Sequence, residues 1–184
     1  LKDDKTYPYI RVTVNEPYPR IMMTRKMKKD GSRYFGPYTS SLAVKDTIEL
    51  LRKIYKIRSC NRSLPKEIGK GRPCLYHHMG QCQAPCQDYI SRENYRENIS
   101  GALSFLSGNY KEVAQMLQNK MQEASDAMEF EKAIEYRDLL NSVHQIAQKQ
   151  KITSAQMDDR DVIAFARAKD EAVVQVFFIR GGKL

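Results

Sequence analysis

Short apolar runs separated by turn-forming residues dominate the first part of the chain. Residues 7–14 (YPYIRVTV) and 20–27 (RIMMTRKM) are rich in β-branched and aromatic side chains, and the breaker stretch 15–19 (NEPYP) separates them. This pattern predicts two strands that form a small hairpin-like unit. Residues 29–38 (KDGSRYFGPY) contain two glycines, a proline and three aromatic residues, which predicts a loop.

Helical periodicity replaces the strand pattern from residue 41 onward. Ser40 and Ser41 precede apolar positions that are spaced for an amphipathic helix through Ile54. Farther along, long stretches of helix formers with almost no Gly or Pro predict three more helices. Their expected ranges are 90–106, 111–127 and about 130–148.

The last two predicted helices are joined by so short a turn that they form an antiparallel hairpin. Residues 126–129 (DAME) have the form of a capping box, which predicts the start of the second arm. Apolar side chains lie at helical spacing on both arms, and the two helices bury these stripes only partly by facing each other. The remaining apolar face predicts a partner.

Two further strands are predicted at the end of the sequence, over residues 161–168 and 171–179. A lone hairpin cannot close a sheet or cover its own edge, so we interpret it as the beginning of another domain. The chain also starts without a Met. We therefore expect an internal fragment of a longer protein.

Charge divides the chain into two parts. Residues 1–86 carry 18 Lys and Arg against 7 Asp and Glu, a net +11, whereas the remainder carries 13 against 15, a net −2. The basic part is where an anionic partner is expected. The longest apolar stretch, residues 172–179, is interrupted by Gln175 and is far too short to cross a bilayer, so no membrane partner is expected.

Three of the four cysteines lie in one short stretch, residues 74–86 (CLYHHMGQCQAPC). With Cys60 they give the spacing C-x13-C-x7-C-x3-C in a segment rich in Gly and Pro, whose irregular backbone can wrap around a centre. Four thiolates suit a Cys₄ iron–sulfur cluster or tetrahedral zinc, although the spacing matches neither common zinc pairs nor ferredoxin runs. The alternatives are two disulfides, scattered buried thiols, and a zinc site that includes His77 or His78. We expect a metal centre whose ligands are Cys60, Cys74, Cys82 and Cys86.

The predicted loop and its surroundings combine positive charge with aromatic rings, a pairing that suits phosphate neutralisation and base stacking. The candidate DNA-binding residues are Arg25, Lys26, Lys28, Lys29, Arg33, Tyr34 and Phe35. Two alternatives remain: the charges form an ordinary solvated face, or the rings, Tyr38 included, anchor the loop against the helix over residues 41–54.

Five segments, read in order, carry a resemblance to a known family. They are LKDDKTYPYI, RYFGPYTS, CLYHHMGQCQAPC, LQNKMQEASDAMEFEKAIEYRD and DRDVIAFARAKDEAVVQVFFIRGGKL. Their order resembles the middle of the UvrC family, the incision subunits of bacterial UvrABC nucleotide excision repair. The resemblance covers essentially the whole chain.

The resemblance implies that catalytic residues lie outside this chain. In the family, a GIY-YIG nuclease domain precedes the first segment, and an RNase H-like domain for the second incision continues beyond the last one. We therefore assign no catalytic residue. Polar residues near the two ends are expected to have structural roles, and these are Tyr7, Tyr9, Arg11, Asp158, Asp159 and Asp161.

The resemblance also implies two binding functions. The four cysteines match a Cys-rich region associated with an iron–sulfur cluster, which favours [4Fe–4S], with zinc as the alternative. The helical pair matches the UVR motif, which is expected to bind a similar hairpin of UvrB. Candidate partner contacts are Leu117, Met121, Phe130, Ile134 and Arg137. Because Arg137 falls within the apolar stripe, we expect Asp138 or a partner carboxylate to pair with it.

Together these inferences predict an α+β multidomain fragment. Its segments are 1–58, the tail of the GIY-YIG domain with a basic linker region; 59–108, a Cys-rich metal-binding module with the following helix; 109–150, the UVR hairpin; and 151–184, the start of the RNase H-like domain. The expected function is the DNA-, metal- and UvrB-binding part of a cytoplasmic protein that incises damaged double-stranded DNA. The alternative is a noncatalytic, metal-stabilised adaptor that links a protein partner to nucleic acid.

Overall fold

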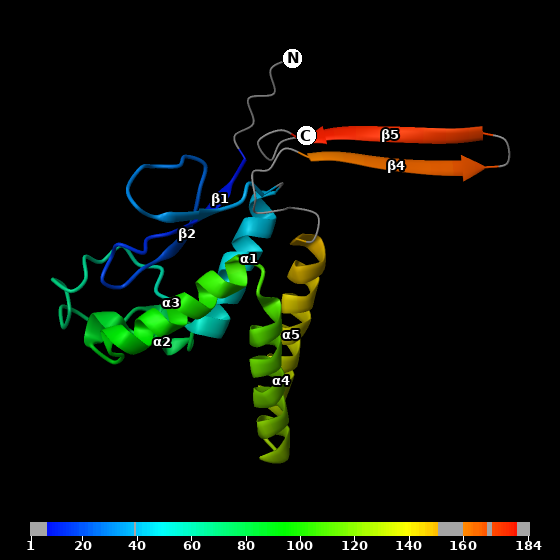
Figure 1. The fold of residues 1–184 in the computed structure, drawn as a ribbon. Helices are drawn as coiled ribbons and strands as arrows, with labels where there is room; N and C mark the ends of the chain where they lie inside the picture. Colours follow the sequence, from blue (N-terminus) through cyan, green and yellow to red (C-terminus); the bar gives the residue numbers. More distant parts are fainter. Residues whose placement is uncertain (1–6, 39, 151–159, 169–170, 180–184) are drawn as a thin grey trace. The chain divides into compact units, whose positions relative to one another are not determined.

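The computed structural model describes residues 7–38, 40–150, 160–168 and 171–179 (Figure 1). The chain divides into two compact units, Leu1–Gln150 and Lys151–Leu184. The first unit holds a small sheet and the helices, and the second holds a two-stranded sheet. The predicted α+β class is confirmed, whereas the metal-binding character of the Cys-rich segment and the boundaries inside the first unit stay predictions.

A three-stranded antiparallel sheet opens the first unit. Its strands are β1 (Tyr9–Val12), β2 (Ile21–Thr24) and β3 (Arg33–Phe35), in the spatial order β2-β1-β3. The predicted hairpin is confirmed as β1 and β2, but the prediction of a continuous loop over residues 29–38 was wrong, because β3 lies within it. Gly31, with a φ of 71°, turns the chain, and Phe35 then pairs with Ile10 along the open edge of β1. An edge strand forms here from residues whose local composition indicates only a turn.

Two helices complete the body of the first unit. Helix α1 (Ser41–Tyr55) packs against β1 and β2, and α3 (Arg92–Leu106) packs against α1. Ser40 caps α1 and Ser91 caps α3, each through a hydroxyl that accepts a hydrogen bond from a backbone N–H at 3.1 Å. Both helices were predicted, and the Ser91 cap explains why α3 begins two residues later than its apolar pattern.

One hydrophobic core joins the sheet to the helices. Its central members are fully or almost fully buried, and they include Ile10, Val12, Val44, Leu51, Phe105, Leu117 and Val143. Gly101 lies at the contact between α3 and α1, where an added Cβ would come within 2.5 Å of the Tyr55 ring. The helices approach this closely only because the position carries no side chain.

The predicted helical hairpin is confirmed as α4 (Tyr110–Asp126) and α5 (Phe130–Gln150), which run antiparallel beside each other (Figure 1). Its turn differs from the predicted capping box. Asp126 stays in α4, and Met128 adopts a left-handed φ of 59°. The N–H of Glu129 bonds to the carbonyl of Ala124 at 2.8 Å, and the N–H of Met128 bonds to that of Ser125 at 2.9 Å. This pattern terminates α4 as a Schellman motif, with Met128 where glycine is usual.

The second unit, within its described residues, is an antiparallel pair of long strands. These are β4 (Arg160–Ala168) and β5 (Glu171–Ile179), and Phe165 pairs with Val174 near the middle. Both strands were predicted. Apolar side chains are exposed on both faces of this pair, among them Phe165, which is 79% exposed. Among the described residues of this unit, no further element packs on either face of the pair. The candidate residues Asp158 and Asp159 lie outside the described residues.

Tyr95 fixes α3 to the rest of the first unit. Its side chain is 0% exposed, and its ring meets the edge of Tyr18 with centroids 5.4 Å apart. Its hydroxyl donates a hydrogen bond to the carbonyl of Pro19 at 2.8 Å and accepts one from the backbone N–H of Arg58 at 3.1 Å. One side chain therefore satisfies two backbone groups from separate segments.

The Tyr95→Phe variant is expected to be less stable than the wild type by about 1–3 kcal/mol, because it leaves these buried backbone groups without a partner. Urea unfolding monitored by circular dichroism measures the change. Tyr89→Phe is the matched control, since Tyr89 is 64% exposed and its loss of a hydroxyl should change little. Equal stability of both variants would contradict a structural role for the Tyr95 hydroxyl.

Candidate functional site

The four cysteines lie on irregular backbone between α1 and α3. Cys60 follows α1, Cys74 immediately precedes the short helix α2 (Leu75–His78), Cys82 follows α2, and Cys86 belongs to the 3₁₀ turn η1 (Pro85–Gln87). All four thiols are free, so the disulfide alternative is not formed. Cys82 and Cys86 are buried, and the other two are partly buried.

Burial and the neighbouring cysteines act on the Cys82 thiol. Burial raises the pKa of the Cys82 thiol to about 11, a hydrogen bond with the Ala84 backbone opposes this, and the charges of Cys74, Cys60 and Cys86 add to it. The Cys82 thiol therefore lies within electrostatic range of the other three cysteines. In the chemistry of its donors, this set fits a soft metal centre.

The described side chains are not positioned to bind one metal ion in this structure. Among the described residues, no group of three or more His, Cys, Asp and Glu side chains is arranged to hold a metal ion. His77 places Nδ1 3.0 Å from the carbonyl oxygen of Cys82, and its ring packs against His78 and Tyr89. The metal centre stays a prediction.

Sequence reasoning missed a buried arginine beside the first cysteine. Arg58 is 2% exposed, and its guanidinium donates to Glu16 at 2.8 Å and to the carbonyl of Tyr18 at 2.9 Å. The same group lies 3.8 Å from Cys60 Sγ. Arg20 binds the second carboxylate oxygen of Glu16 at 2.6 Å. In the local sequence KIRSCNRS, Arg58 is one basic residue among several, so no signal marks it as buried.

These charges settle the ionisation of Glu16. Burial alone would raise the pKa of this carboxyl, but the hydrogen bond and charge of Arg20, together with the charge of Arg58, outweigh burial and lower it. Glu16 is therefore held as a carboxylate between two guanidinium groups. This ion cluster ties the connection between β1 and β2 to the Cys-rich segment.

The candidate DNA-binding residues fall into two groups. Arg25, Lys26, Lys28 and Lys29 lie in the connection between β2 and β3, where their side chains are exposed. The ion pair of Arg11 with Asp30, and a hydrogen bond from the Asn15 amide to the Asp30 carbonyl at 2.6 Å, hold this connection against β1. The structure thus presents four cations on one anchored loop, hereafter the basic loop (residues 25–32).

The aromatic candidates hold the basic loop in place. Tyr34 accepts a hydrogen bond from the Lys28 backbone N–H at 2.9 Å and lies 3.4 Å from Asp30. Phe35 is partly buried against the hydrophobic core, and the Arg33 guanidinium lies 5.5 Å from the centre of its ring. Tyr34 therefore supports the basic loop from within, and Phe35 packs against the core; base stacking and anchoring against α1 both stay predictions.

The candidate partner contacts lie at different depths in the hairpin. Leu117 is 1% exposed and packs in the core of the first unit, so it supports α4 from within and is covered by the chain itself. Met121 is partly buried, whereas Phe130 and Ile134 are exposed. Arg137 is also exposed, and its guanidinium donates to Asp138 at 3.1 and 3.2 Å, which confirms the expected pairing. The exposed apolar residues thus gather toward the turn of the hairpin.

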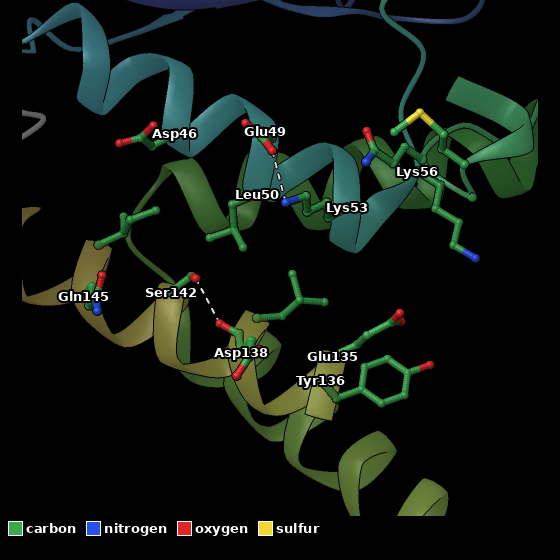
Figure 2. A pocket seen from close by; sticks show the side chains of 15 residues that line it. Asp46, Glu49, Leu50, Lys53, Lys56, Glu135, Tyr136, Asp138, Ser142 and Gln145 are labelled. Carbon is green, nitrogen blue, oxygen red and sulfur yellow. Dashed lines mark hydrogen bonds and ion pairs between the residues drawn. The ribbon is translucent and has the colours of Figure 1, made fainter. Parts of the chain in front are cut away.

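A cleft of about 750 Å³ separates the base of the hairpin from α1, and no sequence signal predicted it. Figure 2 shows Leu50 of α1 facing α5, with Ser142 and Asp138 on the opposite side. Glu49 pairs with Lys53 at 3.0 Å on the α1 side. The hairpin therefore meets the body of the first unit in two places, through α5 beside α1 and through the start of α4 beside α3.

None of the described helices is long and apolar enough to cross a membrane. Comparison with known proteins gives three family matches in sequence order. Residues 7–105 match the UvrC/Cho excinuclease middle domain, residues 111–146 the UvrB/uvrC motif, and residues 159–184 the UvrC ribonuclease H-like domain. No solved structure matches the chain.

Curated relatives named UvrABC system protein C are similar to the whole chain. Identity is 61% with the protein of Lachnospira eligens, 53% with that of Acetivibrio thermocellus and 50% with that of Caldanaerobacter subterraneus subsp. tengcongensis. The chain spans about 30% of the length of these relatives. Since the middle-domain match alone covers more than half of the 184 residues, the chain belongs to the UvrC family.

Proposed function

We propose that this chain is the central, noncatalytic part of a protein that incises damaged DNA on both sides of a lesion in bacterial nucleotide excision repair. The observation that carries the proposal is the order of the three family matches along one chain. In this role the chain binds DNA, docks UvrB and holds a metal cluster, while the cutting groups come from other parts of the protein. The site of action is the cytoplasm.

DNA contact is assigned to the basic loop. Its cations are exposed, and Asp30, the acidic residue within it, is already engaged by Arg11. The pKa of Asp30 is lowered, first by a hydrogen bond from the Ser32 backbone. The loop therefore presents unneutralised positive charge, which suits the phosphates of a duplex.

Replacing Lys26, Lys28 and Lys29 by Gln should weaken duplex binding and flatten its salt dependence. Each lysine that contacts a phosphate contributes about 0.9 to the slope of log K against log salt. Fluorescence anisotropy over a series of salt concentrations measures that slope. The control replaces Lys45, Lys111 and Lys120 by Gln, an equal change of charge on exposed helical positions. An identical slope in both variants would leave the basic loop as a solvated surface.

Partner docking is assigned to the turn end of the α4–α5 hairpin. The core residues Leu117 and Val143 fix the hairpin to the first unit, and this leaves Met128, Phe130 and Ile134 exposed. Phe130, which is 62% exposed, has the largest side chain of the three. An exposed apolar patch on a fixed helical pair suits a second helical pair, and the UVR match favours UvrB.

Phe130→Ala should weaken binding to the UvrB hairpin by about 2 kcal/mol, roughly 30-fold, because an aromatic anchor would be lost. Calorimetry measures the affinity, and circular dichroism should show unchanged helicity because Phe130 is exposed. The control is Leu42→Ala, which truncates an exposed apolar residue on α1. Wild-type affinity, or lost helicity, would count against Phe130 as a contact.

The metal is assigned to Cys60, Cys74, Cys82 and Cys86. The support is the free state of all four thiols, the electrostatic influence of the other three on the Cys82 thiol and the family match over this segment. These cysteines would hold a [4Fe–4S] cluster, with zinc as the alternative. A bound cluster supplies a crosslink through backbone that otherwise has little regular structure.

Anaerobically purified protein should contain about four iron and four acid-labile sulfide ions per chain, as a [4Fe–4S] cluster requires. Elemental and sulfide analysis measures both. Cys86→Ser should lose the cluster, whereas His78→Ala should retain it, because His78 is not among the assigned ligands. Zinc without sulfide would establish the alternative, and protein free of both would contradict either metal.

A further inference from the structure

The Cys-rich segment displays a group of rings on its surface. The His77 ring lies 5.4 Å from that of Tyr89 and 5.6 Å from that of His78, measured between centroids. Tyr89 and Tyr76 are exposed. Leu75 and Met79, at either end of α2, are exposed as well. We call the rings of residues 76–78 and 89 the ring group. None of these rings belongs to the hydrophobic core, and His77 also contacts the backbone carbonyl of Cys82 through Nδ1.

A turn that carries three cations is hydrogen-bonded to the Cys-rich segment at Gln87. The turn spans residues 66–72, and Lys66, Lys70 and Arg72 are exposed on it. The Arg62 guanidinium donates to the carbonyl oxygens of residues 70 and 72, at 3.3 and 2.9 Å. The Gln87 amide donates to the carbonyl of residue 71 at 3.0 Å, and Gln87 lies two positions before Tyr89. These bonds hold the backbone of the turn to the segment that carries Tyr89.

The three cations of the turn are available to a ligand. Within the described part of the chain, none of them forms an ion pair. Cations without acidic partners favour a polyanion, whereas an apolar protein surface would leave them uncompensated. Exposed rings next to such cations bind nucleic acid through stacked bases. In a duplex the bases are already stacked on one another, so this combination favours an unpaired strand.

We propose that the ring group and the turn over residues 66–72 form a binding surface for single-stranded DNA. The proposal rests on the proposed function, DNA binding. It adds a second DNA-binding surface and names single-stranded DNA as the ligand of that surface. The turn binds the phosphates, and Tyr76 and Tyr89 stack on bases.

The fold relates this surface to the basic loop. Asn61, just before the turn, accepts a hydrogen bond from Arg20 at 2.8 Å. Asn15 bonds to the carbonyl of Asp30 in the basic loop. Both segments are therefore attached to the connection between β1 and β2. A DNA molecule that is paired in one part and open in another would meet both surfaces, the duplex at the basic loop and the open strand at the rings.

The test compares binding of the full chain to a labelled oligo-dT strand and to a blunt duplex by fluorescence anisotropy. The ring variant carries Tyr76→Ala and Tyr89→Ala. It should lose about fivefold or more in affinity for the strand, the effect of one lost stacked base, and keep its affinity for the duplex. Tyr89→Phe retains the ring and should bind the strand as the wild type does. Equal metal content and circular dichroism in all variants exclude a folding defect.

The cations are tested in the same assay by replacing Lys66, Lys70 and Arg72 with Gln. This turn variant should flatten the salt dependence of strand binding relative to the control at Lys45, Lys111 and Lys120. Wild-type strand affinity in the ring variant overturns the proposal and leaves the rings as a surface for a protein partner. If the ring and turn variants match the wild type while the basic-loop variant loses duplex binding, this proposal alone fails. If no variant changes binding to either DNA, the assigned DNA function fails as well.

Discussion

The burial of one guanidinium group constrains the first unit of this chain. Arg58 carries a charge that water does not reach, so its donors must find partners within the protein. Those partners are Glu16, the carbonyl of Tyr18 and backbone carbonyls of the Cys-rich segment. The backbone N–H of the same residue is held by Tyr95 of α3. The sheet, the cysteine segment and α3 therefore keep the mutual arrangement in which the Arg58 charge is paired. The surfaces proposed to bind DNA lie on these segments, so their relative positions depend on the same arrangement.

The spacing of apolar residues predicted most of the regular structure, because each helix or strand that buries one face carries apolar residues at the period of that face. Helices α1, α3, α4 and α5 and both long strands follow from apolar spacing, and Ser40 marks the start of α1, whereas α2 and η1 were not predicted. The exceptions depend on contacts between distant residues or on backbone conformation. Strand β3 forms because Phe35 meets the edge of β1. The helical turn was misread because Met128 adopts a left-handed conformation that side-chain spacing does not reveal.

The candidate sites were also predictable to different degrees, because residue types are visible in the sequence whereas contacts between distant residues are not. Four cysteines in one segment are visible in the sequence, but the spacing does not specify the positions of their sulfur atoms. The apolar stripe of the hairpin was visible as well, yet it does not distinguish Leu117, which the core of the first unit covers, from Phe130, which it leaves exposed. Tyr34 resembles a stacking residue in the sequence, whereas its hydroxyl is occupied by the loop that it supports. The contacts that each side chain makes in the fold, which residue type does not reveal, separate these cases.

The contact between Gly101 and Tyr55 limits how this sequence can vary over evolutionary time. Glycine inside a helix is less stable than alanine by about 0.5–1 kcal/mol, so mutation to alanine would be favoured by helix propensity alone. At this position the added methyl group would collide with a ring that is itself packed between helices. The two positions are therefore expected to change together: a larger residue at 101 becomes tolerable only in a lineage that has first replaced Tyr55 by a smaller one.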